Sequence, residues 1–167
     1  LGGGRRWVGR RRRRCCFLKV KSIIKRLRTV RPDIAISSDF IVGYPGETEA
    51  DFKSTLRLVE KVGFAQSYSF KYSPRPGTPA SESRNQIDVE ASAERLAVLQ
   101  HLLDSQQRSF NRSKVGKTLE VLLEKPGRKR NQLVGRSPYL QAVHVDKTSE
   151  SGDLKIGDLV HVDVIGS

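Results

Sequence analysis

The chain has 167 residues, of which 37% are apolar and 29% are charged, and its formal net charge is +13. This apolar content excludes a wholly disordered chain, and the length allows one ordinary domain or two small ones. Thirteen of the 31 basic residues lie between Leu1 and Arg31, where no acidic residue occurs, so the rest of the chain carries 18 basic and 18 acidic residues. The net charge alone therefore does not identify a nucleic-acid surface on the folded part.

The basic start of the chain has the composition of an extension. Residues 1–14 are Gly and Arg apart from one Trp, one Leu and one Val, and they show no helical or strand period. The segment lacks the apolar stretch of a secretory signal. We expect residues 1–18 to be disordered. The segment could be an RNA-binding arm or an extension with no evolved role, and we favour the second interpretation.

Cysteine usage and hydropathy restrict the compartment and the metal chemistry. The two cysteines, Cys15 and Cys16, are adjacent, whereas the ligands of zinc and iron–sulfur sites are spaced along a loop. We therefore expect no metal site in this chain. No apolar run approaches the 18 residues of a membrane span, and we expect a cytoplasmic protein without membrane contact.

Alternating helical and strand patterns follow from residue 20. Apolar residues at positions 20, 23, 24, 27 and 30 predict a helix that ends before Pro32. Residues 34–42 predict a strand, and residues 43–46 a tight turn. Thr48 is a good N-cap with Asp51 at the capping-box position, and Gly63 is a natural end for that helix. Residues 66–72 predict a second strand, with Tyr72 on the same face as the other aromatic residues.

This order of elements is typical of a parallel α/β unit, in which ligands bind at the carboxyl ends of the strands. Two segments would lie there, residues 43–47 and the proline-rich residues 73–80. A longer helix over residues 90–110 follows. After Asn111, short β-like runs at 118–123, 132–134, 142–145 and 159–165 predict a small antiparallel barrel or sheet.

Each candidate motif has a functional and a structural interpretation. Residues 43–47, GYPGE, are not a phosphate-binding P-loop, and a structural strand-to-helix turn is the better reading of them alone. Asp39 is an unusual residue inside a strand. It could point into a ligand cavity or pair with a neighbouring Arg, and both remain open.

The tail segment carries the pattern of an RNA-binding surface. Seven basic and two acidic residues lie between Lys114 and Val145. Three of the basic residues, Arg128, Lys129 and Arg130, fall on a predicted hairpin loop. Basic loops near an aromatic residue on a small β-barrel suit RNA contact, although an ordinary solvated hairpin would have the same composition.

Three strings resemble one family. SDFIVGYPGET at residues 38–48 and FKYSPRPGTPA at residues 70–80 resemble the strand and loop segments of radical-SAM tRNA methylthiotransferases. GRSPYLQ at residues 135–141 resembles the TRAM domain of the MiaB-type members. The resemblance covers about residues 20–165. It implies the C-terminal part of a partial TIM-type radical-SAM barrel over residues 19–111, followed by an OB-like antiparallel TRAM barrel over residues 112–167, one strand short of the family's pattern.

The resemblance also implies a function. The family adds a methylthio group to isopentenylated adenosine next to the anticodon of tRNA, using S-adenosylmethionine and 4Fe–4S clusters held by a C-x3-C-x2-C loop and by an N-terminal domain. This sequence has neither, so we expect the chain alone to be inactive. The alternative is a non-catalytic RNA-binding module with an α/β appendage.

The resemblance assigns roles to individual residues. Asp39, Ile41 and Gly43 match a segment that helps to hold S-adenosylmethionine, and Tyr72 and Arg75 match the strand end that faces the same cavity. The expected contacts to the tRNA anticodon stem-loop come from the tail residues Arg128, Lys129, Arg130, Arg136, Tyr139 and Gln141.

Overall fold

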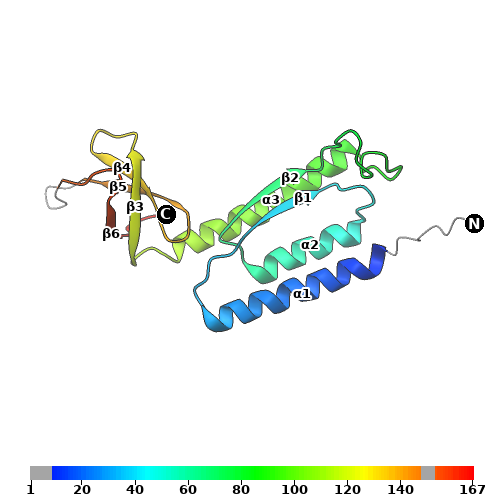
Figure 1. Ribbon diagram of the computed structural model, residues 1–167, viewed down its shortest axis with the longest axis horizontal. Helices are drawn as coiled ribbons and strands as arrows, with labels where there is room; N and C mark the ends of the chain where they lie inside the picture. The colour runs from blue at the N-terminus through cyan, green and yellow to red at the C-terminus, as the bar shows by residue number, and fades with distance from the viewer. Residues whose placement is uncertain (1–8, 148–152) are drawn as a thin grey trace, which may run out of the picture. The chain divides into compact units, whose positions relative to one another are not determined.

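The computed structural model describes the backbone of residues 9–147 and 153–167, and the side chains from residue 19 onward within these ranges. The chain divides into two compact units, one reaching to Gln106 and the other comprising Gln107–Ser167 (Figure 1). Each unit has its own apolar core, and each is described separately below.

The first unit alternates helices and strands in the order that the periodicity predicts. It contains α1 (Gly9–Val30), β1 (Ser37–Val42), α2 (Glu49–Val62), β2 (Gln66–Lys71) and the greater part of α3 (Val89–Arg112). The two strands pair in parallel, with Ser37 opposite Gln66 and Val42 opposite Lys71. The predicted parallel α/β unit is thereby confirmed.

The core of this unit lies on one face of the two strands. Val42 is 1% exposed and packs with apolar residues of all three helices, among them Phe52 and Leu99. Phe40, on the same face, contacts the ring of Phe64 edge-on at 5.3 Å between centroids. The helices therefore cover one face of the strand pair, and the alternate residues of the strands point to the other face.

Local signals set the ends of α2 as expected. Thr48 accepts a hydrogen bond from the Asp51 backbone N–H, and the Asp51 carboxylate accepts one from the Thr48 backbone N–H, which completes the capping box. At the other end Gly63 adopts a left-handed conformation with φ 63°, and its N–H donates to the carbonyl of Val59. Both predicted helix ends are confirmed.

The start of α1 differs from the expectation. The disordered extension was expected over residues 1–18, but α1 begins at Gly9, so the backbone of residues 9–18 is helical, while the part of this expectation that falls on residues 1–8 lies outside the described residues. The physical reason is that Arg is among the best helix formers. Adding residues to an existing helix also costs far less than starting one, so a helix can extend without an apolar period of its own.

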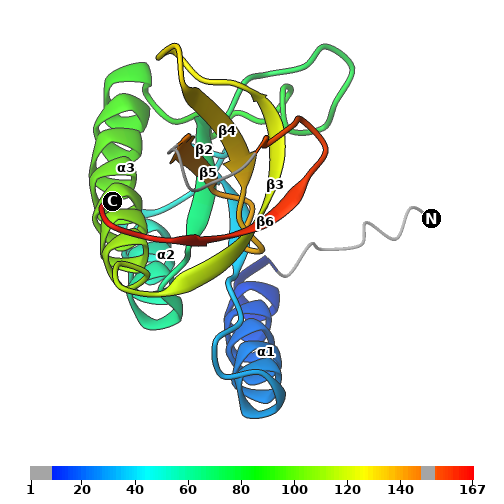
Figure 2. The same cartoon turned by 90° about the vertical axis from the view of Figure 1, so that its left-hand side faces the viewer.

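The second unit is an antiparallel sheet that follows the end of α3. Its strands are β3 (Thr118–Pro126), β4 (Gln132–Arg136), β5 (Ala142–Asp146) and β6 (Leu159–Asp163), in the spatial order β5-β4-β3-β6. The sheet curls around a core that includes Val121 and Leu123, which are 0% and 1% exposed (Figure 2). This half-barrel is compatible with the predicted small β-barrel domain. No helix in the described part of the chain is long and apolar enough to cross a membrane.

Candidate functional site

The uncovered face of the first unit combines apolar, aromatic and acidic side chains. Asp39 lies beside Tyr68 and Ile41 beside Phe70 in the register of β1 and β2, and all four are exposed. The exposed fractions of the three apolar residues are between 54% and 59%. Among the described residues, the Asp39 carboxylate has no ion-pair partner. This face therefore presents an unpaired carboxylate within an apolar strip.

The turn after β1 is fixed by a close approach to α3. Gly43 has φ 73°, which favours glycine, and a Cβ at this position would lie 2.3 Å from the hydroxyl oxygen of Ser92. Its backbone N–H donates to the carboxylate of Glu47 at 2.8 Å. The glycine is thus required by the turn and by the packing of α3, which supports the structural interpretation of the GYPGE segment.

Glu47 connects this turn to α3 through a buried ion pair. Its carboxylate lies 2.9 Å from a guanidinium nitrogen of Arg95, and the two side chains are 9% and 14% exposed. The same nitrogen donates to the Glu47 carbonyl at 3.2 Å, and the guanidinium lies over the ring of Phe52. Because this pair is partly desolvated and hydrogen-bonded, it holds the carboxyl end of β1 at a defined place on the helix.

The carboxyl end of β2 lies next to that of β1. The Tyr72 N–H donates to the carbonyl of Val42 at 2.8 Å, and the rings of Tyr72 and Tyr44 meet edge-on at 5.2 Å. The Tyr72 hydroxyl is buried and lacks a hydrogen-bond partner among the described residues. Arg75 follows in an exposed loop, where its carbonyl accepts from Thr78. Of the five predicted cofactor residues, the structure places Asp39, Ile41, Gly43 and Tyr72 on or beside this strand pair, and Arg75 on the loop that leaves it.

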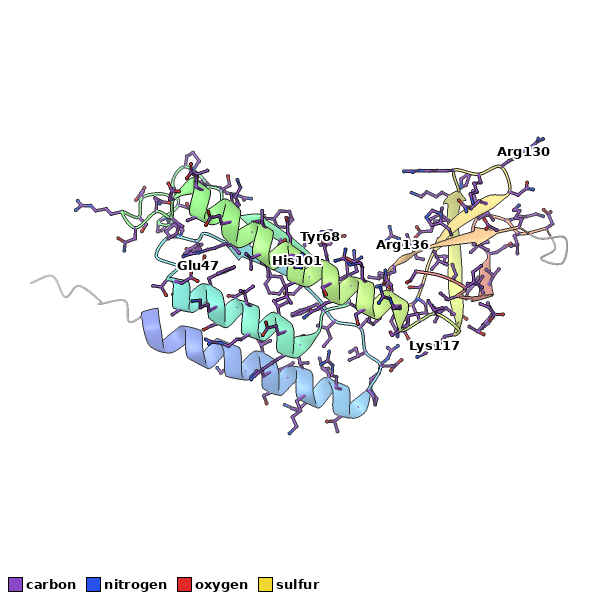
Figure 3. All side chains as sticks on the ribbon, turned by 180° about the vertical axis from the view of Figure 1, so that it is seen from behind. Glu47, Tyr68, His101, Lys117, Arg130 and Arg136 are labelled. Carbon is purple, nitrogen blue, oxygen red and sulfur yellow. The ribbon has the colours of Figure 1, made fainter. Side chains whose placement is uncertain are left out.

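On the second unit, the loop between β3 and β4 carries three adjacent cations. Arg128, Lys129 and Arg130 are exposed, and their side chains make no hydrogen bond or ion pair within the described ranges. The loop is closed at its base by the Gly127 N–H, which donates to the carbonyl of Gln132 at 2.6 Å. Arg130 extends from the hairpin (Figure 3). The hairpin therefore offers an uncompensated positive charge on a well-defined support.

The other predicted tail residues have partners within the unit. Arg136 pairs with Glu124 at 3.1 Å and donates to the carbonyl of Leu140. The Gln141 carbonyl accepts from the backbone N–H of Ser137 at 3.0 Å. Both residues thus help to hold the segment between β4 and β5, and this segment carries Tyr139.

Tyr139 is half-buried in an aromatic and cationic cluster. Its ring meets Phe110 edge-on at 5.3 Å, and the Lys114 ammonium lies 4.0 Å from its centroid and 4.4 Å from that of Phe110. Lys114 is only 9% exposed, so the cation is largely enclosed. Tyr139 is therefore part of the packing of this unit, and any base that stacks on it must use the remaining exposed part of the ring.

Several residues at these sites were not among the predicted ones. Tyr68 and Phe70 could have been chosen from the strand alternation, because they share a face with Tyr72. The Glu47–Arg95 pair gave no signal, since the two residues are separated by 48 positions along the chain. The side chains in the described part of the chain form no group of three or more potential metal ligands.

Comparison with known proteins relates this geometry to relatives. The tRNA-2-methylthio-N(6)-dimethylallyladenosine synthase of Maricaulis maris (strain MCS10) is 62% identical over 129 residues, which are 77% of this chain and 28% of that protein. The protein of the same name from Agrobacterium fabrum (strain C58) is 55% identical over 140 residues, which are 84% of this chain and 30% of that protein. The chain thus spans less than a third of the length of these curated relatives. No family model matches the chain.

Proposed function

Because this chain is homologous over most of its length to a segment of the tRNA-2-methylthio-N(6)-dimethylallyladenosine synthases, we propose that it supplies part of an enzyme that methylthiolates isopentenylated adenosine beside the anticodon of tRNA. The observation that carries this proposal is the 62% identity over 129 residues. That stretch is longer than either compact unit, so it includes residues of both. A role on tRNA also makes the cytoplasm the proposed compartment.

The first unit is proposed to be part of a radical-SAM barrel. Two parallel strands with helices on one face and an open apolar face have the local geometry of a barrel segment, whose strands direct alternate residues inward. The proposed cofactor residues are Asp39, Ile41, Gly43, Tyr72 and Arg75.

The open face fits S-adenosylmethionine in its chemistry. Asp39 is an unpaired carboxylate that would balance the positive charge of the sulfonium or ammonium group, and the apolar strip suits the adenine ring. The Tyr72 hydroxyl at the strand end is buried without a hydrogen-bond partner among the described residues, so a cofactor would reach it only after the covering side chains move. The cofactor supplies the radical chemistry of the family, and the proposed part of this chain is to bind and orient it.

A 4Fe–4S cluster does not fit the residues of this chain. Only two cysteines are present, they are adjacent, and a cluster of this kind takes four thiolates or three with an exchangeable site. We therefore assign the cluster ligands to other parts of the enzyme and expect no reductive cleavage of S-adenosylmethionine by this chain alone.

The second unit is proposed to bind the anticodon stem-loop as a TRAM domain. The support is the exposed hairpin of Arg128, Lys129 and Arg130, whose charges lack acidic partners within the described ranges. We also assign RNA contacts beside this hairpin to Arg136, Tyr139 and Gln141. Of these, Arg136 pairs with Glu124 in the unbound chain. Cations of this kind contact phosphates and fix the register of an RNA without reading its sequence.

The test is a salt titration of RNA binding by the full chain. Each neutralised phosphate contributes about 0.7–0.9 to the slope of log affinity against log salt. Replacing the three hairpin cations by Ala should reduce this slope by about two to three such contributions and leave the preferred RNA unchanged. Replacing Lys155, which pairs with Asp153 on the same unit, is the control and should leave the slope unaltered. Failure of the unaltered chain to bind a tRNA anticodon stem-loop at low salt would contradict the proposal.

A further inference from the structure

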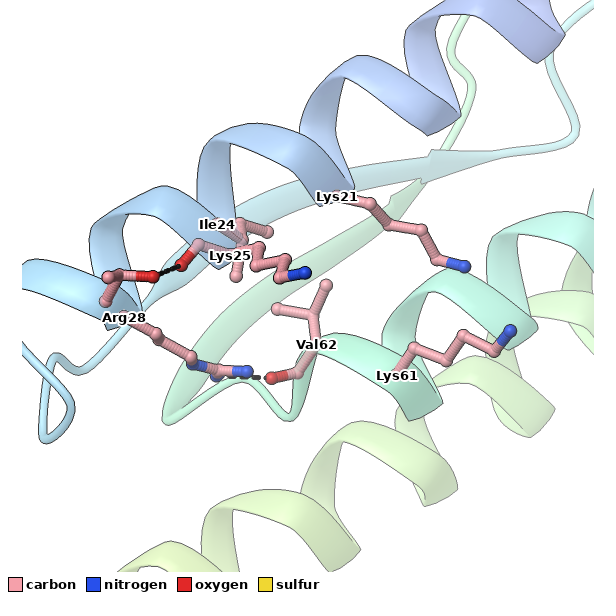
Figure 4. A pocket seen from close by; sticks show the side chains of 7 residues that line it. Lys21, Ile24, Lys25, Arg28, Lys61 and Val62 are labelled. Carbon is pink, nitrogen blue, oxygen red and sulfur yellow. Dashed lines mark hydrogen bonds between the residues drawn. The ribbon is translucent and has the colours of Figure 1, made fainter.

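A groove between α1 and α2 gathers four cations on the helical side of the first unit. It is lined by Lys21, Lys25 and Arg28 of α1 and by Lys61 of α2, and it has a volume of about 380 Å³ (Figure 4). Its apolar lining consists of Ile24 and Val62, which are 8% and 3% exposed. The groove therefore presents four basic side chains above two buried apolar ones.

Three of the four groove cations, Lys25, Arg28 and Lys61, have no ion pair with an acid among the described residues. The Arg28 guanidinium donates to the carbonyls of Val62 and Gly63, at the end of α2, and not to a carboxylate. Lys25 and Lys61 have no acidic partner in the described part of the chain. The pKa of Lys21 is lowered, first by its hydrogen bond with Lys61, then by desolvation and by repulsion from the same ammonium. Two amines held this close favour an anion between or beside them, because the anion relieves their repulsion.

We propose that this groove binds phosphates of an RNA backbone, at a site separate from the β3–β4 hairpin. The inference rests on the proposed function, since tRNA is the RNA that the enzyme would hold. The groove residues of α1 belong to a helix of 22 residues with ten basic residues and no acidic one. Five of these ten follow residue 18, where the side chains are described, and together with Lys61 they suit a polyanion better than a single phosphate ion.

The test compares two charge-matched pairs of substitutions in the full chain. K25Q/K61Q removes one groove cation from each helix. It leaves Arg28 in place, because this residue holds the end of α2. It also leaves Lys21, whose acetylation rate reports whether RNA occupies the groove. K19Q/K53Q removes one cation from each of the same helices outside the groove, where Lys53 pairs with Glu49. Far-UV circular dichroism checks that both variants keep the helical content of the unaltered chain.

The readout is the affinity for a fluorescent tRNA anticodon stem-loop over a range of KCl concentrations. We expect K25Q/K61Q to lower the salt slope by about one to two phosphate contributions of 0.7–0.9 each, and K19Q/K53Q to lower it by less than half of one. Bound RNA should also slow the acetylation of Lys21 and leave that of Lys53 unchanged.

The outcomes separate this inference from the proposed function. If the unaltered chain binds the stem-loop and the two double variants lower the salt slope by the same amount, the groove assignment is overturned while the proposed function stands. If the unaltered chain does not bind the stem-loop, the proposed function fails and the inference fails with it. Binding of phosphatidylserine vesicles that depends on the groove pair, without any effect of that pair on RNA, would also overturn the assignment to RNA.

Discussion

Loss of the Arg95 side chain should destabilise the first unit by much more than loss of an exposed charge. The Glu47 side chain is 9% exposed in the unaltered protein, and in Arg95→Ala its carboxylate would lose the guanidinium and keep only the hydrogen bond from the Gly43 N–H. Removing one partner of a buried pair costs about 3–5 kcal/mol. We expect about 3 kcal/mol, the lower end, because 14% of the Arg95 side chain is still exposed.

A double-mutant cycle separates the ion pair from the rest of the arginine. Glu47→Gln keeps an acceptor for the Gly43 N–H but removes the charge, and in that background Arg95→Ala should cost only about 1 kcal/mol because no buried carboxylate is left unpaired. The difference of about 2 kcal/mol between the two backgrounds is the coupling. Arg31→Ala is the control, since Arg31 and Asp33 form a pair with side chains 61% and 58% exposed. It should cost less than about 1 kcal/mol.

The assay is urea unfolding followed by circular dichroism, together with hydrogen exchange of peptides from β1 and α3. Exchange localises the effect, because the chain has two compact units that need not unfold together. If Arg95→Ala lowers the free energy of unfolding by no more than Arg31→Ala does, the ion pair does not hold the carboxyl end of β1, and the account of this turn is wrong.

Three further predictions concern the turn, the groove and the tail. Gly43→Ala should destabilise the chain by about 2–4 kcal/mol through left-handed strain and the contact with α3, whereas Gly46→Ala, with φ 78° and no atom within 4 Å of the new Cβ, should cost about 1–2 kcal/mol in urea unfolding. Lys61→Gln should raise the pKa of Lys21 toward its ordinary value, because it removes the largest cause of the lowering, and slower acetylation of Lys21 at neutral pH would report this change. Tyr139→Ala should weaken RNA binding by about 1–3 kcal/mol and leave the salt slope unchanged, because the ring stacks on a base and carries no charge. It should also lower the stability of the second unit, because the ring packs against Phe110 and Lys114. A changed salt slope or an unchanged stability would count against this assignment.

The sequence predicted the features of the fold that depend on neighbours along the chain. Alternation placed the aromatic residues of β2 on one face, and side-chain chemistry at Thr48 and Gly63 set the ends of α2, because caps act within one helical turn. The antiparallel strands of the tail were recognised because turn residues separate short β-like runs.

The features that sequence could not predict depend on contacts between distant residues. Glu47 meets Arg95 and Lys114 meets Tyr139 only after folding, and neither pair has a periodic or local signature. The same holds for the groove, whose cations come from two helices separated by a strand. The start of α1 was missed for another reason: an arginine-rich run has helix propensity without an apolar period.

Exchange of the homologous segment in a curated relative tests the central proposal most directly. The segment of the Maricaulis maris protein that matches this chain would be replaced by the corresponding 129 residues of this chain and expressed in cells that lack the enzyme. Mass spectrometry of tRNA nucleosides then gives the ratio of methylthiolated to merely isopentenylated adenosine. We predict that the exchanged protein restores the methylthiolated nucleoside, and that Asp39→Ala or Arg75→Ala within it lowers the ratio. A folded and soluble exchanged protein that binds tRNA but leaves the isopentenylated nucleoside unmodified would contradict the account and favour a non-catalytic RNA-binding module.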